Sequence, residues 1–261
     1  MQIHHNKNGE FYMPNIHSTI SFGLVSIPVL MNPIIKNNDT SFNQLHSKCL
    51  SRVKYVKYCP VCKKELKETD IVKGYEFERD NYIIFDKEEL SKLKPEDEHE
   101  VEVVSFIDLK SVDPVYFEKS YFLGIDNKSR AYELFYSALK KTGLSALAKC
   151  ILNGKFYYAI LRLNEEGIVL TTLYFKEEVN IPELTIKNES NSRELNLAVK
   201  LIESMKGKFE PDKYKDEYQD TIKNAIEDKL DGKKIKGTKK TRKTEVKSLM
   251  EALEKSLKDV K

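Results

Sequence analysis

The sequence has no tryptophan and only four cysteines among its 261 residues, and no apolar run approaches the length of a membrane helix. A spanning helix takes about 20 consecutive apolar residues, so we expect no transmembrane segment. No positively charged and then apolar leader ends in small residues, so no secretory signal is predicted. Because thiols stay reduced in the cytoplasm, the four cysteines of a cytoplasmic protein are not expected to form a disulfide framework. We therefore expect a cytoplasmic protein with free thiols.

The sequence also lacks the short motifs of common enzymes. It contains no Walker loop, no GxGxxG and no GxSxG pattern. Its carboxylates are scattered through charged runs, where a solvated face is the simplest interpretation. The absence of a motif does not exclude an enzyme, but nothing in the sequence requires one. We expect a non-catalytic protein.

Positive charge is segregated along the chain, although the net charge is only +3. Residues 232–243 carry seven Lys or Arg and no acid, so the rest of the chain sums to −4. Residues 47–64 hold six further basic residues and no acid. A segregated basic patch is the electrostatic footprint of a protein that binds phosphate. The alternative is a set of solvated lysines that only maintain solubility.

Hydrophobic periodicity predicts a body of β-strands. Asn153-Gly154, between two apolar runs, favours a type I′ hairpin. These strands are too apolar to form a lone ribbon, so we expect them to close a sheet or barrel in an α+β, mainly β, fold. Strands are expected near residues 20–30 (interrupted near Gly23 and Pro28), 71–77, 82–85, 101–107, 116–124, 146–152, 155–163 and 168–175.

Helical spacing interrupts and then follows this body. Residues 129–141 predict a helix that ends at Gly143, and Asp86 is expected to cap a short helix. Two further apolar stripes, separated by Pro211, follow Arg193. The chain is therefore divided into an unstructured leader (1–15), a core (16–192), a helical arm (193–231), a basic linker (232–244) and a terminal helix (245–261).

The terminal helix carries a clean apolar stripe. The basic linker before it cannot form a packed core, and an isolated helix of this length is marginal in water. We expect the stripe to bind a groove on a partner. The alternative is packing within the chain. The stripe consists of Val246, Leu249, Met250, Leu253 and Leu257.

Three cysteines and a histidine have the spacing of a zinc site. His46, Cys49, Cys59 and Cys62 give the pattern His-x2-Cys-x9-Cys-x2-Cys. This set suffices for a closed tetrahedral structural site, in which His46 is the weakest member. The alternatives are a redox CxxC, thiols buried as small apolar groups, and a hydrolytic zinc centre, for which no HExxH-like spacing is present. Cys150 lies alone in an apolar run and is expected in the core.

Several sequence blocks, in order, resemble prokaryotic Ku, the family of bacterial non-homologous end joining. The resemblance covers roughly residues 16–231 and the terminal helix. The leader departs from it, and so does His17, where the family usually has an aromatic residue. The matching blocks are residues 20–28, 42–46, 52–55, 59–62, 70–76 and 113–121, Thr142-Gly143, Ala148-Lys149 and residues 249–253.

This resemblance implies a β-barrel with a long bridge, about residues 36–80, inserted between early strands. It implies a homodimeric, nucleoid-associated ring that binds the ends of double-stranded DNA through backbone contacts, because a ring that accepts any end cannot depend on base edges. One structural zinc per subunit would hold the thin bridge together. The terminal helix would recruit a DNA repair ligase with polymerase activity. The basic residues expected at DNA are Arg52, Lys54 and Lys57, with Lys73 and Lys149 as weaker candidates that could be ordinary surface lysines.

Two other functions are compatible with the same features. A zinc-ribbon adaptor of transcription or RNA processing would also use a CxxC and basic residues, but would more often show aromatic residues that stack on bases. A metal-dependent nuclease is the third hypothesis. Binding to linear duplex, to closed circles and to single strands separates them.

Overall fold

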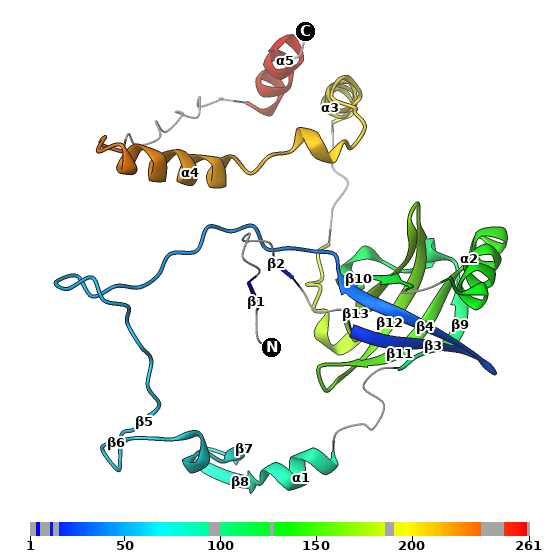
Figure 1. Cartoon of the computed structure of the whole chain (residues 1–261). Coiled ribbons are helices and arrows are strands. Elements are labelled where there is room, and N and C mark those ends of the chain that lie inside the picture. The colour runs from blue at the N-terminus through cyan, green and yellow to red at the C-terminus, as the bar shows by residue number, and fades with distance from the viewer. Residues whose placement is uncertain are drawn as a thin grey trace. The chain divides into compact units, whose positions relative to one another are not determined.

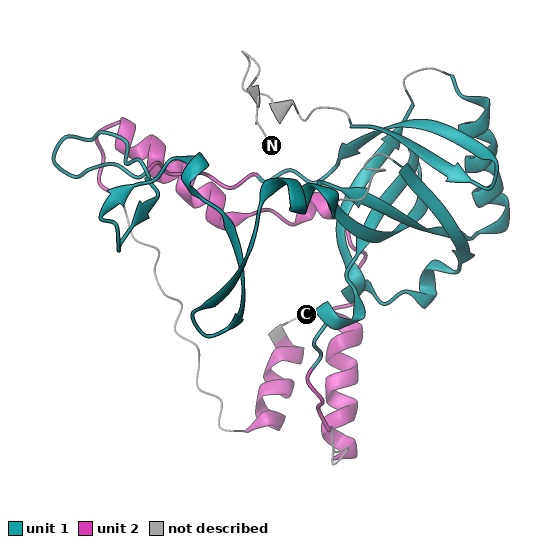
Figure 2. Cartoon of the chain, turned by 90° about the horizontal axis from the view of Figure 1, so that it is seen from below, with its two compact units in different colours: residues 1–37, 44–181 teal, residues 38–43, 182–261 magenta. Residues whose placement is uncertain are grey.

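The computed structural model describes residues 4–5, 11–12, 16–93, 100–125, 128–185, 191–235 and 248–259. The chain forms two compact units, residues 1–37 with 44–181, and residues 38–43 with 182–261 (Figure 2). Within the described ranges, no helix combines the length and the apolar character that crossing a membrane requires.

Seven strands of the first unit close into a barrel in the order β10-β13-β12-β11-β9-β3-β4 (Figure 1). Neighbours are antiparallel except for β3 and β9, which are parallel. Closure leaves the sheet without an open edge, and it confirms the expected barrel and the α+β fold. The strands are β3 (Ile16–Phe22), β4 (Val25–Pro33), β9 (Glu100–Ile107), β10 (Phe117–Gly124), β11 (Ser145–Leu152), β12 (Lys155–Asn164) and β13 (Gly167–Leu173).

The first two barrel strands form a hairpin where the sequence predicted one interrupted strand. Gly23 adopts a left-handed φ of 59° in the turn, beside the fully exposed Leu24. Pro28 does not interrupt β4, where it lies opposite Thr19. The prediction of one interrupted strand was wrong because the sequence alone does not distinguish a tight turn from a bulge. Both place a glycine inside an apolar run.

The barrel interior is filled by side chains from all seven strands. Ile20, Met31, Leu123, Leu161 and Leu170 have no exposed surface. β11 and β12 are joined at Asn153-Gly154 with φ values of 55° and 73°, as the hairpin prediction required. Cys150 is buried in the core, and burial raises its pKa to about 12. Its predicted place in the core is confirmed.

Helix α2 (Arg130–Thr142) packs against the barrel through buried Tyr132, Phe135 and Leu139. The Tyr132 hydroxyl donates to the Leu123 carbonyl at 2.7 Å and accepts from the Ile168 amide at 3.0 Å. The helix therefore ties two barrel strands together through a single side chain. Gly143 ends it with a left-handed φ of 69°, as predicted.

A long insertion separates β4 from β9, and we call residues 44–93 the inserted segment. Its elements are small, and none of its side chains is buried. The pairing of β7 with β8 and the capping of α1 by Asp86 confirm two predictions. The elements are β5 (Tyr58–Cys59), β6 (Lys64–Glu65), the 3-10 turn η1 (Glu68–Asp70), β7 (Lys73–Glu78), β8 (Asn81–Phe85) and α1 (Lys87–Lys92).

The second unit contains three helices in its described part: α3 (Ser192–Ser204), α4 (Glu217–Leu230) and α5 (Leu249–Asp259). The Thr40 amide donates to Oε1 of Gln219 at 2.9 Å, which fixes residues 38–43 to α4. α5 lies against α3. Short 3-10 turns complete the chain: η2 (Leu109–Ser111), η3 (Pro114–Tyr116), η4 (Lys176–Glu178) and η5 (Pro211–Lys213).

The termini match the predicted division only in part. Two short strands pair within the leader that was expected to be unstructured, β1 (His4–His5) with β2 (Phe11–Tyr12). The remainder of residues 1–15, and most of the basic linker, lie outside the described residues.

Candidate nucleic-acid interface

The inserted segment begins with a tight loop that positions Arg52. The His46 amide donates to the Ser51 carbonyl at 2.9 Å, and the Leu50 amide donates to the His46 carbonyl at 2.8 Å. Leu50 takes a left-handed φ of 55° to complete the turn. Arg52 pairs with Leu45 in an isolated β-bridge. The loop therefore places a basic residue at a defined backbone position.

The predicted DNA contacts in this segment differ in their ion pairs. Arg52, Lys54 and Lys73 are exposed and form no ion pair with any described residue. The Lys57 ammonium instead donates to the Glu68 carboxylate at 2.6 Å. The hydrogen bond and the charge of Lys57 lower the pKa of Glu68. Lys57 is therefore already neutralised by its own chain.

Lys149 lies on barrel strand β11, outside the inserted segment. Its ammonium lies 2.9 Å from the carboxylate of Glu102, which is its partner residue on β9. The hydrogen bond to Glu102 raises the pKa of Lys149. Opposite charges facing each other across two strands are a common surface pairing. Lys149 therefore has an acidic partner on the barrel, and its contact with DNA stays a prediction.

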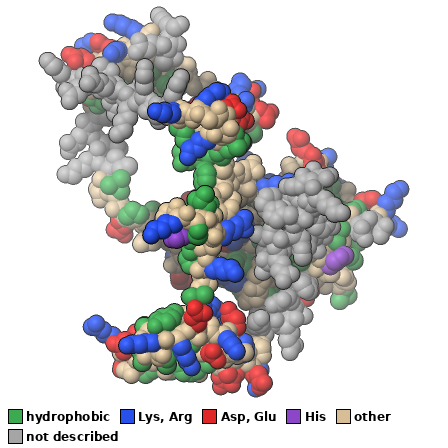
Figure 3. Space-filling model, turned by 60° about the vertical axis from the view of Figure 1, so that its left-hand side comes forward, with side chains coloured by type: hydrophobic (Ala, Val, Ile, Leu, Met, Phe, Trp, Pro, Cys, Tyr) green, Lys and Arg blue, Asp and Glu red, His purple; other side chains and the backbone are tan. Residues whose placement is uncertain are grey.

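Apolar side chains of the inserted segment are exposed beside its basic ones. On the face drawn in Figure 3, Lys and Arg side chains lie among apolar ones. In the part of the chain that is described, β7 and β8 pair only with each other, so each has an open edge. An isolated two-stranded hairpin is marginally stable in water. The exposed large apolar residues of this hairpin are Tyr75, Phe77, Tyr82, Ile83 and Ile84.

The predicted zinc ligands are brought together in two pairs. Nδ1 of His46 lies 3.0 Å from Sγ of Cys49, and the Cys62 amide donates to Sγ of Cys59 at 3.4 Å. Among the described residues, no three His, Cys, Asp or Glu side chains converge on one point. Each pair can supply two ligands, but a four-ligand site requires the pairs to approach each other.

Hydrogen bonds with Ser51 and His46 lower the pKa of Cys49 to about 7. The thiols of Cys49 and Cys62 are exposed, and Cys59 is half-buried. The alternative in which these thiols are buried as small apolar groups is therefore wrong. Cysteines that are exposed and hydrogen-bonded in this way are compatible with thiolate ligands.

Comparison with known proteins identifies the family of this barrel and its insertion. A family model described as the Ku70/Ku80 beta-barrel domain matches residues 21–197. The chain belongs to the Ku family. It is 37% identical over 242 residues to the non-homologous end joining protein Ku of Desulfitobacterium hafniense, covering 92% of this chain and 85% of that protein.

Two further relatives have the same name. The Ku protein of Lachnoclostridium phytofermentans is 38% identical over 242 residues, covering 92% of this chain and 94% of the relative. That of Bacillus subtilis is 38% identical over 221 residues, covering 82% and 71%. The predicted resemblance to bacterial Ku is confirmed, and the match extends beyond the barrel into the helical second unit.

The terminal helix of this Ku-family chain does not stand free. Met250, Leu253 and Leu257 are half-buried on the helix that lies against α3, whereas Leu249 is 65% exposed. Val246 lies outside the described residues. The stripe therefore packs within its own chain here, as the alternative had it, and docking on a partner stays a prediction. The composition of the basic linker could not predict the contact between α5 and α3, because it does not determine where the following helix packs.

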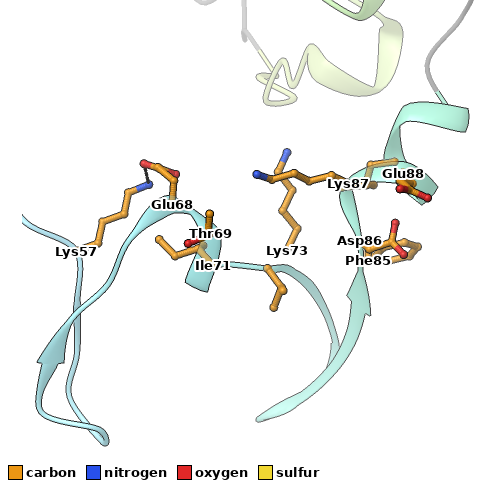
Figure 4. Close-up of a pocket in the computed structure, with 11 residues that line it drawn as sticks. Lys57, Glu68, Thr69, Ile71, Lys73, Phe85, Asp86, Lys87 and Glu88 are labelled. Atoms are coloured by element: carbon orange, nitrogen blue, oxygen red, sulfur yellow. Dashed lines mark hydrogen bonds and ion pairs between the residues drawn. The ribbon is translucent and has the colours of Figure 1, made fainter.

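Sequence reasoning missed one basic residue that the fold places beside Lys73. Lys87 is the first residue of α1 and lines an open hollow of about 670 Å³ together with Lys57 and Lys73 (Figure 4). The sequence feature that could have identified Lys87 is its position directly after Asp86, which caps α1. Hairpin pairing then brings this position back beside the start of β7.

Proposed function

We propose that this chain is a non-catalytic Ku protein that binds the ends of double-stranded DNA without sequence specificity in non-homologous end joining. The observation that supports it best is the inserted segment of a Ku-family barrel, which carries unpaired cations and buries none of its side chains. Such a segment gains little stability by itself. It becomes useful when a polyanion and a second protein surface cover it.

Backbone phosphates are the ligand that fits these cations. Arg52 and Lys54 are single exposed charges with no described carboxylate against them. Phosphate contacts position a protein on a duplex without reading its sequence. Affinity should therefore fall steeply with salt and be uniform across sequences.

The binding test compares four nucleic acids of matched length. Linear duplex should bind, closed circular duplex should bind poorly, and single-stranded DNA and RNA should not compete. Replacing Arg52 and Lys54 with Glu should weaken binding to all linear duplexes alike. Equal binding to circles would contradict the end-binding proposal, and cleavage after addition of magnesium or manganese would support a nuclease instead.

A homodimer accounts for the apolar surface of the inserted segment. Its hairpin exposes Tyr75 and Ile83 on one face and Tyr82 and Ile84 on the other. An exposed apolar patch of this kind, with open strand edges, marks an interaction surface. A second copy of the chain is the proposed cover, so the native mass should be twice 30.3 kDa. A monomeric mass at micromolar concentration would contradict this proposal.

Recruitment of a DNA repair ligase is assigned to α5. The helix is short, its half-buried side chains include Met250, Leu253 and Leu257, and the Arg193–Glu254 pair that links it to α3 is exposed, with atoms 3.9 Å apart. Exposed pairs of this kind contribute little. A ligase groove can therefore replace α3 as the cover of Leu253 and Leu257.

Truncation after Asp231 tests this assignment. The shortened protein should remain dimeric, hold DNA ends and fail to stimulate ligation. Leu253→Asp should have the same effect on ligation, and Lys255→Ala, on the same helix, is the matched control. Ligation that survives truncation would show that α5 is dispensable.

One structural zinc per subunit remains a proposal, with His46, Cys49, Cys59 and Cys62 as its ligands. The two pairs fit a thiolate-rich tetrahedral site in donor type and in their spacing along the sequence. Elemental analysis of protein purified without chelator should find one zinc per chain. Replacing Cys59 and Cys62 with Ser should remove it and weaken DNA binding while the barrel stays folded. Well-folded wild type without metal would reject the site.

A further inference from the structure

Three lysines line the hollow of the inserted segment, and one of them forms an ion pair with a described carboxylate. Lys57 stands on one side, bound to Glu68 at 2.6 Å. Lys73 and Lys87 stand on the other side, and their ammonium groups point toward the same open space (Figure 4). Neither forms an ion pair with a described residue. The charge of Lys87 also lowers the pKa of Glu68, and Glu88 lines the same hollow, so Lys73 and Lys87 lack an ion pair but have carboxylates nearby.

The backbone places the two lysines without an ion pair near each other. Lys73 lies directly opposite Phe85 in the β7–β8 pair. Lys87 follows Phe85 by two residues and begins α1. β8 ends at Phe85, so Lys87 lies beyond the ladder, and its position depends on the turn from β8 into α1 as well as on the register.

Three carboxylates near the hollow already have partners, and a fourth, Glu88, lines the hollow beside Lys87. Oδ1 of Asp86 accepts from the Glu89 amide at 2.7 Å, and Oε2 of Glu89 accepts from the Asp86 amide at 2.9 Å. Glu68 is held by Lys57. Reciprocal capping bonds of this kind stabilise the start of the helix. Moving these carboxylates to Lys73 or Lys87 would break the cap or the ion pair.

We propose that Lys73 and Lys87 together hold a single phosphate of the DNA backbone. Two ammonium groups aimed at one space repel each other until an anion lies between them, and a phosphodiester has two unesterified oxygens to share between them. This inference rests on the proposed function, and it moves the main phosphate contact of the hollow from Lys57 to the lysine pair.

Sharing one phosphate predicts that the two lysines are not additive. Lys73→Ala and Lys87→Ala should each weaken binding to a linear duplex about 3–10-fold near 150 mM salt, and the double variant little more than either. The double variant should also reduce the salt slope of log K by about 0.9, the value for one phosphate. Lys73→Arg with Lys87→Arg should retain most of the affinity.

The matched control is Lys92→Ala, an exposed lysine farther along α1 that does not line the hollow. It should change affinity by less than about twofold. Multiplicative losses from Lys73 and Lys87, or an equal loss from Lys92, would overturn the proposal.

Two further comparisons distinguish failure of the proposed end binding from failure of the shared phosphate contact. If wild type does not prefer linear duplex to closed circles, the proposed function fails, whatever the lysine variants do. If wild type binds ends and the double variant binds them equally well with an unchanged salt slope, only the shared phosphate contact fails. Inorganic phosphate at millimolar concentration should compete weakly, and to the same degree for linear duplexes of any sequence. Strong competition at micromolar phosphate would identify a free-anion site instead and overturn the assignment to DNA.

Discussion

The barrel and the inserted segment both contain strands rich in apolar residues, yet only the barrel buries them. Leu161 and Leu170 have no exposed surface, whereas Tyr75 is 65% and Ile84 55% exposed. Each barrel strand has a neighbour on both sides, and closure gives every strand an interior face. β7 and β8 have only each other among the described residues. The barrel thus contains the buried core, and the inserted segment has a surface suited to partners.

The largest expected effect comes from creating a cavity in the barrel. Leu161→Ala should lower the free energy of unfolding by about 2–5 kcal/mol, because the lost contacts cannot be replaced in a closed interior. Ile84→Ala, in the inserted segment, should change the barrel transition by less than about 0.5 kcal/mol. Urea unfolding followed by circular dichroism measures both. Equal losses would show that the segment is part of the barrel's cooperative unit.

A smaller effect is expected from the hydroxyl that links α2 to the barrel. Tyr132→Phe leaves the Ile168 amide without its acceptor and should cost about 1–3 kcal/mol. Tyr136→Phe on the same helix is the control, because its hydroxyl makes no hydrogen bond with a described residue. Thermal unfolding of both variants checks this, and identical values would indicate that water replaces the lost bond.

Much of the barrel could be predicted because its strands follow local rules. Alternating or continuous apolar runs located β9 to β13, and Asn153-Gly154 located a turn. The first hairpin was missed because Gly23 in an apolar run has two local interpretations. The Ku resemblance supplied the insertion, which periodicity alone could not connect to the barrel.

The site was less predictable because pairing between distant residues decides it. Nothing in the sequence pairs Lys57 with Glu68, which is eleven positions away, or Lys149 with Glu102. Lys87 became relevant only through the register that places Phe85 opposite Lys73 and through the turn from β8 into α1. Residue type therefore identified a basic region, and geometry decided which of its charges lack an ion pair.

A third prediction concerns assembly without a change in barrel stability. Ile84→Asp places a charge on the exposed face of the β7–β8 hairpin and should shift the proposed dimer toward monomer. The unfolding free energy of the barrel should stay within about 0.5 kcal/mol of wild type, because the side chain is outside the core. Sedimentation at several concentrations measures the dimer. An unchanged dimer constant would place the interface elsewhere.

The smallest effect is expected from Glu68→Gln, and it is a gain. The Lys57–Glu68 pair is exposed, so its loss should not measurably destabilise the protein. The substitution instead frees the Lys57 ammonium and removes an anion beside the DNA, so affinity for linear duplex should rise about two- to threefold at low salt. In wild type, Lys57 holds the pKa of Glu68 below its usual range. The carboxylate therefore stays ionised at neutral pH and is protonated only as the pH falls through that lowered pKa, so wild-type binding should strengthen relative to Glu68→Gln in this acidic range. Duplex titrations of both proteins from neutral pH downward measure the difference. A weaker Glu68→Gln at neutral pH would mean that Glu68 orients Lys57 toward phosphate and does not sequester it.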